Sequence, residues 1–416
     1  MKVLVLGSGL LGVVTAYELG KRGFEVTVLE RNAESARETS YANGGQLSYT
    51  HAEPWASRAV LGKLLKWLFR SDAPLVFHPR ADLDMIRWGV KFLSNCTTAR
   101  ANMNCVNLLR LGLYSKDTFD IIRQETGIVF DFYSRGILHI FSTDHDFDHS
   151  KKQYEFQAKF GSEHRVLTRE QCLAIEPCLA ATSRTIVGGI HAIQDEIGDT
   201  YNFCTALAKI AAERYGVKFE YGVTIKKLHA ENKVITRVTT DKGDRSADGY
   251  VMAMGSYSPV LLKQVGIDVP IYPMKGYSIT IDADEFCPQS SITDQSHKVV
   301  YSRVGTRMRM AGTAEFAGYN TRINEKRIRP MVRAGKELFP QANWNQEIHK
   351  WACLRPSTPD GPPIMGRTPL SNLFLNTGHG TLGWTQAAGS AVILADLMQG
   401  KPPGILLNGF TLERFM

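Results

Sequence analysis

Residues 1–30, MKVLVLGSGLLGVVTAYELGKRGFEVTVLE, decide the fold of this chain. The unbroken apolar run over 2–6 is what a strand buried on both faces of a parallel sheet requires. GSGLLG at 7–12 follows, and then come a helical pattern over 13–19 and a second strand pattern that ends in Glu30. This order predicts a dinucleotide-binding strand–helix–strand unit.

Each glycine of the turn has a physical task. Gly7 permits the tight turn, Gly9 lets backbone amides approach a pyrophosphate, and Gly12 lets the helix pack closely on the strand. Glu30 is placed to accept hydrogen bonds from the adenosine ribose hydroxyls and would repel a 2′-phosphate. The glycines do not choose between FAD and NAD, because both cofactors carry the adenosine diphosphate half.

Composition bounds the class of protein. Of 416 residues, 44% are hydrophobic and 22% charged, as in a soluble globular protein of two or three domains. The net charge of +8 favours anionic partners, but the basic residues are dispersed and we recognise no nucleic-acid-binding module, so we expect no nucleic acid partner. No apolar run reaches the length of a membrane span.

The cysteines and histidines do not indicate a metal. Seven cysteines occur without a CxxC pair or a zinc-like spacing, which indicates reduced thiols in the cytoplasm and no disulfides. His145 and His149 lie in the polar stretch STDHDFDHS, where we expect a solvated linker because no further ligands are nearby.

A donor-rich stretch follows Glu30. In RNAESARETSYANGGQLS, residues 31–48, backbone and hydroxyl donors suit phosphates and a flavin ring. Later stretches are VMAMGSYS (251–258), YPMKGYSIT (272–280), LRPSTPDGPPIMGRT (354–368) and NTGHGTLGWT (376–385). With the first motif, they resemble FAD-dependent D-amino acid dehydrogenases of the small-subunit type, in the D-amino acid oxidase and glycine oxidase superfamily, over essentially the whole chain.

The resemblance implies FAD and its contacts. A nicotinamide enzyme would share the first motif but would not explain GHGTLGWT near the end of the chain. The expected cofactor-binding residues are Gly7, Gly9, Leu10, Leu11, Gly12, Glu30, Arg31, Thr39, Ser40, Asn43, Gly44, Gly45, Gln46, Val223, Gly255, Gly380, Thr381, Leu382, Gly383 and Trp384. Residues 380–383 open a predicted helix, so their amides are expected at the flavin N1–C2=O edge; a glycine and threonine helix cap is the alternative.

The expected fold class is α/β in two parts. A discontinuous Rossmann-like FAD-binding domain takes residues 1–78, 150–265 and 353–416, and an α+β substrate domain takes residues 79–149 and 266–352. Apolar spacing from Asp82 to Gly127 predicts one long amphipathic helix. After Pro270, strands rich in Tyr, Ile and Val predict a mostly antiparallel sheet that covers the flavin.

Four side chains are candidates for contact with substrate. Arg355 resembles the family's carboxylate-binding arginine, because a guanidinium holds a carboxylate through two parallel hydrogen bonds; neutralisation of Asp360 is the alternative. Tyr277 and Tyr301 lie on the covering strands, where each phenol either donates to the carboxylate or packs in the core. His51, in SYTHAEPW, belongs either to a mobile active-site loop or to an exposed one.

The resemblance implies oxidative deamination of D-amino acids to 2-oxo acids and ammonia. We expect hydride transfer from Cα to flavin N5 and no acid/base dyad, because the cofactor is the electron acceptor. The resemblance implies that the electrons pass to a quinone or another non-oxygen acceptor. The alternative is a related flavin amine oxidoreductase that acts on D-hydroxyproline, sarcosine or glycine and uses oxygen.

Two further features bear on location and on cofactor attachment. LGKLLKWLFR, residues 61–70, interleaves Trp67 and Phe69 with basic residues and favours peripheral contact with an anionic membrane, with core packing as the alternative. Cys353 lies where sarcosine oxidases bond FAD covalently, although a buried inert thiol is the main interpretation.

Overall fold

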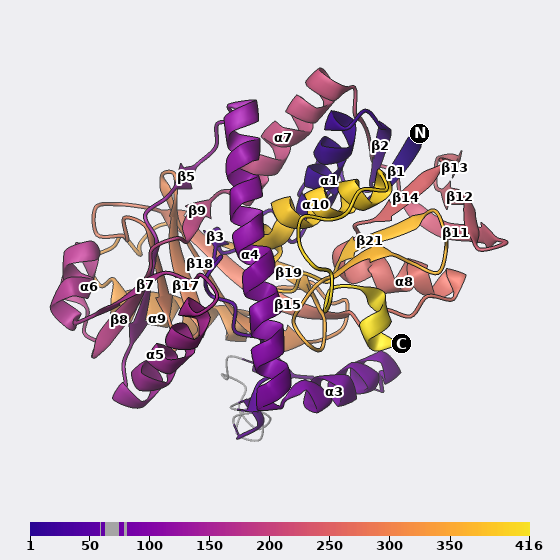
Figure 1. Ribbon diagram of the computed structural model, residues 1–416. Helices are drawn as coiled ribbons and strands as arrows, with labels where there is room; N and C mark the ends of the chain where they lie inside the picture. The colour runs from indigo at the N-terminus through magenta and orange to yellow at the C-terminus, as the bar shows by residue number, and fades with distance from the viewer. Residues whose placement is uncertain (59, 63–74, 79–80) are drawn as a thin grey trace.

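The structure is a computed structural model that describes residues 1–58, 60–62, 75–78 and 81–416. Two large sheets organise these residues, with the long helix α4 (Thr98–Thr126) between them in the view of Figure 1. The two sheets agree with the expected α/β fold class of a Rossmann-like part and a second, mostly antiparallel part.

The first sheet contains the N-terminal strand. Its order is β10 (Lys218–Tyr221), β2 (Glu25–Glu30), β1 (Lys2–Leu6), β14 (Gly249–Met252), β21 (Leu373–Thr377) and β20 (Ile364–Arg367). All neighbours are parallel except β20 and β21. Strand β1 lies inside this sheet with its Val3–Leu6 part buried, which is the environment that its apolar run predicts.

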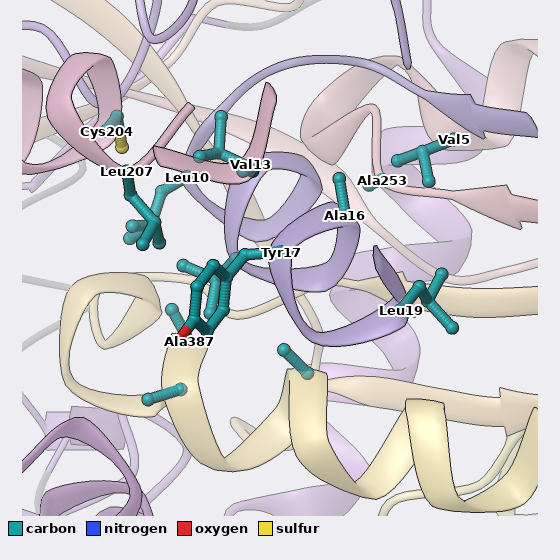
Figure 2. Close-up of a cluster of buried hydrophobic side chains, with 14 of the residues drawn as sticks. Val5, Leu10, Val13, Ala16, Tyr17, Leu19, Cys204, Leu207, Ala253 and Ala387 are labelled. Atoms are coloured by element: carbon teal, nitrogen blue, oxygen red, sulfur yellow. The ribbon is translucent and has the colours of Figure 1, made fainter. Parts of the chain in front are cut away.

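Helix α1 (Leu10–Lys21) is buried on several sides at once. It packs against α7 (Thr200–Tyr215) and α10 (Gly383–Met398), which come from distant parts of the chain. Figure 2 shows Val13 and Tyr17 of α1 among side chains such as Leu207 and Ala387. Asp199 caps α7 by accepting from the amides of Tyr201 and Asn202.

The second sheet is mostly antiparallel, as expected. Its order is β19 (His349–Ser357), β15 (Tyr272–Asp282), β18 (Arg307–Phe316), β17 (Val299–Val304), β16 (Ser291–Asp294), β6 (Ile137–Phe141), β8 (Gly188–Ala192) and β7 (His164–Leu167). Strand β4 (Leu75–Phe77) pairs in parallel with β18, and β16 pairs in parallel with β6.

Smaller elements complete the described chain. One small sheet holds β11 (Ile225–Glu231), β12 (Val234–Thr240) and β13 (Gly243–Arg245), and another holds β3 (Gln46–Leu47), β9 (Glu196–Gly198) and β5 (Phe132–Tyr133). The other helices are α3 (Leu83–Asn95), α5 (Asp144–Ala158), α6 (Arg169–Ile175), α8 (Ser258–Leu262) and α9 (Glu325–Leu338). The 3₁₀ turns are η1 (Pro177–Ala181), η2 (Gly255–Tyr257), η3 (Lys263–Val265) and η4 (Leu412–Phe415).

Strand pairing differs from the predicted division of the chain. Strands β7 and β8 lie in the second sheet, although residues 150–265 are expected in the cofactor domain. Strand β19 also pairs there, through β15, although it overlaps the expected cofactor segment 353–416. Helix α4 packs on α10, on the cofactor side. The sheet to which each of these strands belongs depends on pairing partners far apart in the sequence. Local sequence patterns do not indicate those partners.

Two predictions of local structure are wrong. The single helix expected from Asp82 to Gly127 is two helices, because Cys96 leaves helical geometry and Thr97 caps α4 by accepting from the amide of Arg100. The stretch expected as a linker, STDHDFDHS, instead begins helix α5, because Thr143 accepts from the amide of Asp146. His145 and His149 are therefore helical.

Candidate cofactor and substrate site

The turn between β1 and α1 has the geometry that its glycines predict. Gly7 has φ +99°, a backbone conformation that favours glycine. A Cβ on Gly12 would lie 1.9 Å from the carbonyl oxygen of Gly7, so only glycine fits there. The position of Gly9 is open, with Ser40 Oγ as the nearest atom to a Cβ at 4.0 Å. The helix amides therefore have room for an anion.

Glu30 lies at the end of β2, buried beside this turn. One carboxylate oxygen accepts from the amide of Ser8 at 2.9 Å, and the other accepts from the amide of Asn32 at 2.8 Å. The amide of Val223 donates to the carbonyl oxygen of Glu30 at 2.8 Å, which places Val223 next to the same edge. Arg31 forms an ion pair with Glu38 and lies over the ring of Tyr257.

The segment from Thr39 to Gln46 connects the two large sheets. Thr39 Oγ1 donates to the carbonyl oxygen of Leu354 on β19 at 3.0 Å. The carbonyl oxygen of Gly44 accepts from Ser302 Oγ on β17 at 2.7 Å, and Gln46 Nε2 donates to Thr293 Oγ1 on β16 at 2.9 Å. Asn43 Nδ2 donates to Thr200 Oγ1 at the start of α7 at 2.8 Å. This segment is thereby fixed at the junction of the two parts.

A cavity of about 1360 Å³ lies at that junction. It exceeds the roughly 300–1,000 Å³ typical of a pocket for one drug-sized ligand, so it has room for a cofactor and a small substrate. Every expected cofactor-binding residue except Gly12 lines it, and so do Arg355, Tyr277 and His51. Gly12 lies behind the turn, where it lets helix and strand approach.

Arg355 on β19 reaches the cavity over a glycine. A Cβ on Gly276 of β15 would lie 2.2 Å from Cζ of Arg355, so the guanidinium occupies the space that a side chain would fill. Arg355 Nη1 donates to the carbonyl oxygen of Thr313 at 3.1 Å. Burial lowers the pKa of Arg355, which remains a base far above neutrality. Asp360 pairs with Arg414 at 2.7 Å, so the alternative role of Arg355 in neutralising Asp360 is wrong.

The start of helix α10 also lines the cavity. Its N-cap is Leu382, and no side chain of the described residues caps its first turn, so the alternative of a threonine cap is wrong. The amide of Gly380 donates to the carbonyl oxygen of Pro356 at 2.9 Å, which ties this loop to β19. The open first-turn amides give this wall a positive end that favours negative charge in the cavity.

His379 is a site residue that the sequence reasoning did not single out. It is 2% exposed and lines the cavity, and neither ring nitrogen has a hydrogen-bond partner among the described residues. Burial lowers its pKa to about 3, so the imidazole is neutral. His379 lies between two glycines of GHGTLG, and neither its spacing nor its neighbours in the sequence indicate a role.

The hydroxyls of Tyr277 and Tyr301 are not placed as expected for donors to a substrate carboxylate. The hydroxyl of Tyr277 donates to Glu315, although its ring contributes to the cavity wall. Tyr301 is fully buried, packs edge-on against Phe339 with ring centroids 5.1 Å apart, and does not line the cavity. Both tyrosines belong to the core cluster that includes Ile328 and Met331 of α9.

His51 and Cys353 lie in the cavity wall. His51 Nδ1 is 3.4 Å from the hydroxyl oxygen of Tyr154, and its ring stacks near that of His139 with centroids 5.0 Å apart. Burial lowers the pKa of His51, which favours the neutral ring. Burial raises the pKa of the Cys353 thiol, which favours the unreactive protonated form.

The fold and this cavity define a flavoprotein of the two-domain oxidoreductase class. The model of the FAD dependent oxidoreductase family, DAO, matches residues 2–397, and the chain belongs to this family. It is 45% identical to the D-amino acid dehydrogenase of Paramagnetospirillum magneticum, over 100% of this chain and 99% of that protein. It is 43% identical to D-amino acid dehydrogenase 1 of Mesorhizobium japonicum, over the full length of both.

Solved structures share the fold. Glycine oxidase from Geobacillus kaustophilus superposes with a TM-score of 0.79 at 21% identity, covering 100% of this chain and 98% of that one. The L-alpha-glycerophosphate oxidase of Mycoplasma pneumoniae with FAD bound gives a TM-score of 0.72 at 17% identity, covering 98% and 97%.

The cofactor of this enzyme is FAD, and the cavity fits it. The open position at Gly9 and the carboxylate of Glu30 suit the adenosine diphosphate half. The uncapped amides at the start of α10, in the part of the wall formed by residues 380–385, provide donors for the rest of the cofactor. Amides without a partner at a helix start are polar groups that a bound cofactor would satisfy.

Proposed function

We propose that this enzyme oxidises D-amino acids to 2-oxo acids and ammonia. The observation that carries the proposal is the guanidinium of Arg355, which lies in the cavity in the space left by Gly276. A fork of donors in a largely apolar wall suits the α-carboxylate of an amino acid. The names of the relatives at 43–45% identity support the D-configuration.

The residues of the chain would orient and desolvate the substrate. Arg355 holds the α-carboxylate, and the hydrogen bond to Thr313 limits rotation of the guanidinium. The walls from both sheets exclude water around the Cα–H bond. Bound FAD supplies the two-electron acceptor for the Cα hydride. The positive end of α10 stabilises negative charge in the cavity more strongly after reduction. Water then hydrolyses the imino acid.

The electron acceptor we propose is a quinone or another non-oxygen oxidant, and the location is the cytoplasm with peripheral contact to the inner face of the cell membrane. No helix in the described parts of the chain has the length and apolar character to cross a bilayer. The stretch on which the membrane contact was predicted includes Trp67 and Phe69, and residues 63–70 lie outside the described residues.

An anaerobic spectrum tests the function. The purified holoenzyme is mixed without oxygen with D- and L-enantiomers of several amino acids, and with sarcosine, glycine and D-hydroxyproline. We expect D-amino acids to bleach the flavin absorbance and L-enantiomers to leave it unchanged. Bleaching by sarcosine, glycine or D-hydroxyproline alone would overturn the proposal and identify the related amine oxidoreductase.

A further inference from the structure

Helix α3 has two apolar faces, of which only one is packed. On the inner face, Trp88 stacks on Phe92 with ring centroids 5.1 Å apart and lies against Phe316 of β18. On the outer face, Leu83, Ile86, Val90 and Leu93 are 69%, 54%, 63% and 53% exposed. These four side chains form the outer stripe of α3.

The spacing of the outer stripe makes it a continuous surface. Positions 83, 86, 90 and 93 recur at three and four residues, which places them along one side of the helix. Among the described residues, no other helix leaves four large apolar side chains this exposed. Single exposed apolar residues are normal on a soluble protein, but a contiguous stripe marks an interaction surface. In Figure 1, α3 lies at the lower edge of the molecule, beside the lower end of α4.

Both cations and acids border the stripe, with Asp82 and Asp84 at its N-terminal end. Arg87 is exposed on the stripe's flank, whereas Lys91, one turn later, donates to the carbonyl oxygen of Phe415 at 3.5 Å. Arg100, also exposed, donates to the carbonyl oxygen of Ser94 at 3.0 Å and so lies at the C-terminal end of α3. The acid of this helix, Asp84, is neutralised by Lys263 at 2.7 Å. An apolar stripe with flanking cations complements an anionic lipid surface.

The inner face of α3 connects this surface to the cofactor end of the cavity. Trp88 and Phe92 line a narrow crevice together with the loop His379–Leu382 that precedes α10. Trp55 lines the same crevice and is 42% exposed, so the crevice meets the outside there. A lipid surface against α3 would therefore lie next to the crevice, on the side from which a lipid-soluble oxidant arrives.

We propose that the outer stripe of α3 seats the enzyme on an anionic bilayer. The inference rests on the proposed function in one respect, namely that the acceptor is a quinone dissolved in that bilayer. A second copy of the chain or another protein on the same stripe is the competing occupant, but neither has a reason to favour the cations beside it.

Vesicle sedimentation tests the proposal. Holoenzyme is mixed with phosphatidylcholine vesicles, with and without phosphatidylglycerol, and the bound fraction is measured by flavin absorbance. We expect binding only with phosphatidylglycerol. Ile86→Ser with Val90→Ser should lower the partition coefficient roughly tenfold or more, because two partly exposed branched side chains lose their transfer into the interface. Arg87→Gln should lower it less and weaken its dependence on salt.

The control is Val129→Ser with Val166→Ser, two valines that are 89% and 48% exposed away from α3. This variant should bind as the wild type does. Equal binding of the α3 variant and the control would overturn the proposal, and so would a wild-type dimer that the α3 variant abolishes in the absence of vesicles. Flavin bleaching by D-alanine is measured on the same samples. If the proposed function is wrong, bleaching will be absent, whereas lipid binding is measured independently of it.

Discussion

At the scale of single residues, the substrate end of the cavity depends on a side chain that is absent. The guanidinium of Arg355 occupies the space that a side chain at Gly276 of β15 would fill. The carbonyl oxygen of Thr313, on β18, accepts a hydrogen bond from this guanidinium. Thr313 has φ +53° at a register shift between β15 and β18, an unusual conformation for a β-branched residue. The bulge turns its carbonyl oxygen toward Arg355.

Replacing Arg355 with Met tests its role in holding the carboxylate. Two charge-assisted hydrogen bonds contribute about 1.5–3 kcal/mol each, so kcat/KM for D-alanine should fall roughly 100- to 10,000-fold. Bound FAD, measured by its absorbance, should remain. Arg237→Met, at an arginine whose side chain is 47% exposed on β12, should leave kcat/KM unchanged. An unchanged kcat/KM in Arg355→Met would refute the assignment.

Gly276→Ala should displace the same guanidinium without removing it. The added methyl would lie 2.2 Å from Cζ of Arg355. We expect KM for D-alanine to rise roughly tenfold or more, as when one charged hydrogen bond is lost, while FAD stays bound. The matched control is Gly89→Ala, because nothing lies within 4 Å of a Cβ there. Steady-state kinetics that do not distinguish the two variants would exclude this steric account.

At the scale of elements, local signals were predictable and distant pairing was not. The unit β1–α1–β2 follows from its own apolar runs and glycines, because turn, helix and strands are neighbours in sequence. The placement of β7, β8 and β19 depends on partners far away in the chain. The break between α3 and α4 rests on Thr97, a capping residue inside a continuous apolar pattern.

The site was predictable where a residue type is tied to one chemistry. Gly7 and Gly9 of the turn and the arginine of LRPS line the cavity, since few residue types can replace them. Tyr301 could not be assigned, because alternation along a strand gives two faces but does not tell which one the core covers. His379 offered no periodic signal, and only its burial without partners draws attention to it.

The β1–α1 turn allows two glycines to be separated by experiment. Gly12→Ala places a methyl 1.9 Å from a backbone oxygen, so the turn must open; we expect a lower Tm and loss of bound FAD. Gly9→Ala meets nothing closer than 4.0 Å, so the FAD-free protein should keep its Tm while its affinity for FAD falls. Calorimetry and FAD titration measure both. Equal Tm losses would contradict this distinction.

At the scale of the whole molecule, a buried carboxyl makes stability depend on pH. Asp195, between β8 and β9, is fully buried, and its Oδ1 accepts from the amide and the hydroxyl of Thr50 at 2.9 Å each. Burial raises the pKa of Asp195 to about 7. In the unfolded chain the pKa is about 3.9, so the folded state keeps a proton that the unfolded state releases between these values.

The contribution of Asp195 to the free energy of unfolding should therefore fall as pH rises through that window. Asp195 accounts for about 4 kcal/mol of loss between pH 4 and pH 8, at 1.36 kcal/mol per unit of pKa. Asp195→Asn is neutral throughout and keeps an oxygen for Thr50. We expect urea unfolding to show that the free energy of unfolding of the variant, relative to that of the wild type, is higher at pH 8 than at pH 5. Parallel curves for the two proteins would exclude this origin.

The cofactor sheet joins the two ends of the chain, since β1 pairs with β14, which pairs with β21, and α1 packs on α10. During synthesis, the nucleotide turn leaves the ribosome long before the strand and helix that complete its surroundings. The nascent chain therefore has no finished pocket, and FAD is loaded only after nearly all of the polypeptide has been translated. FAD therefore binds to chains that have left the ribosome, and these chains must avoid aggregation until FAD binds.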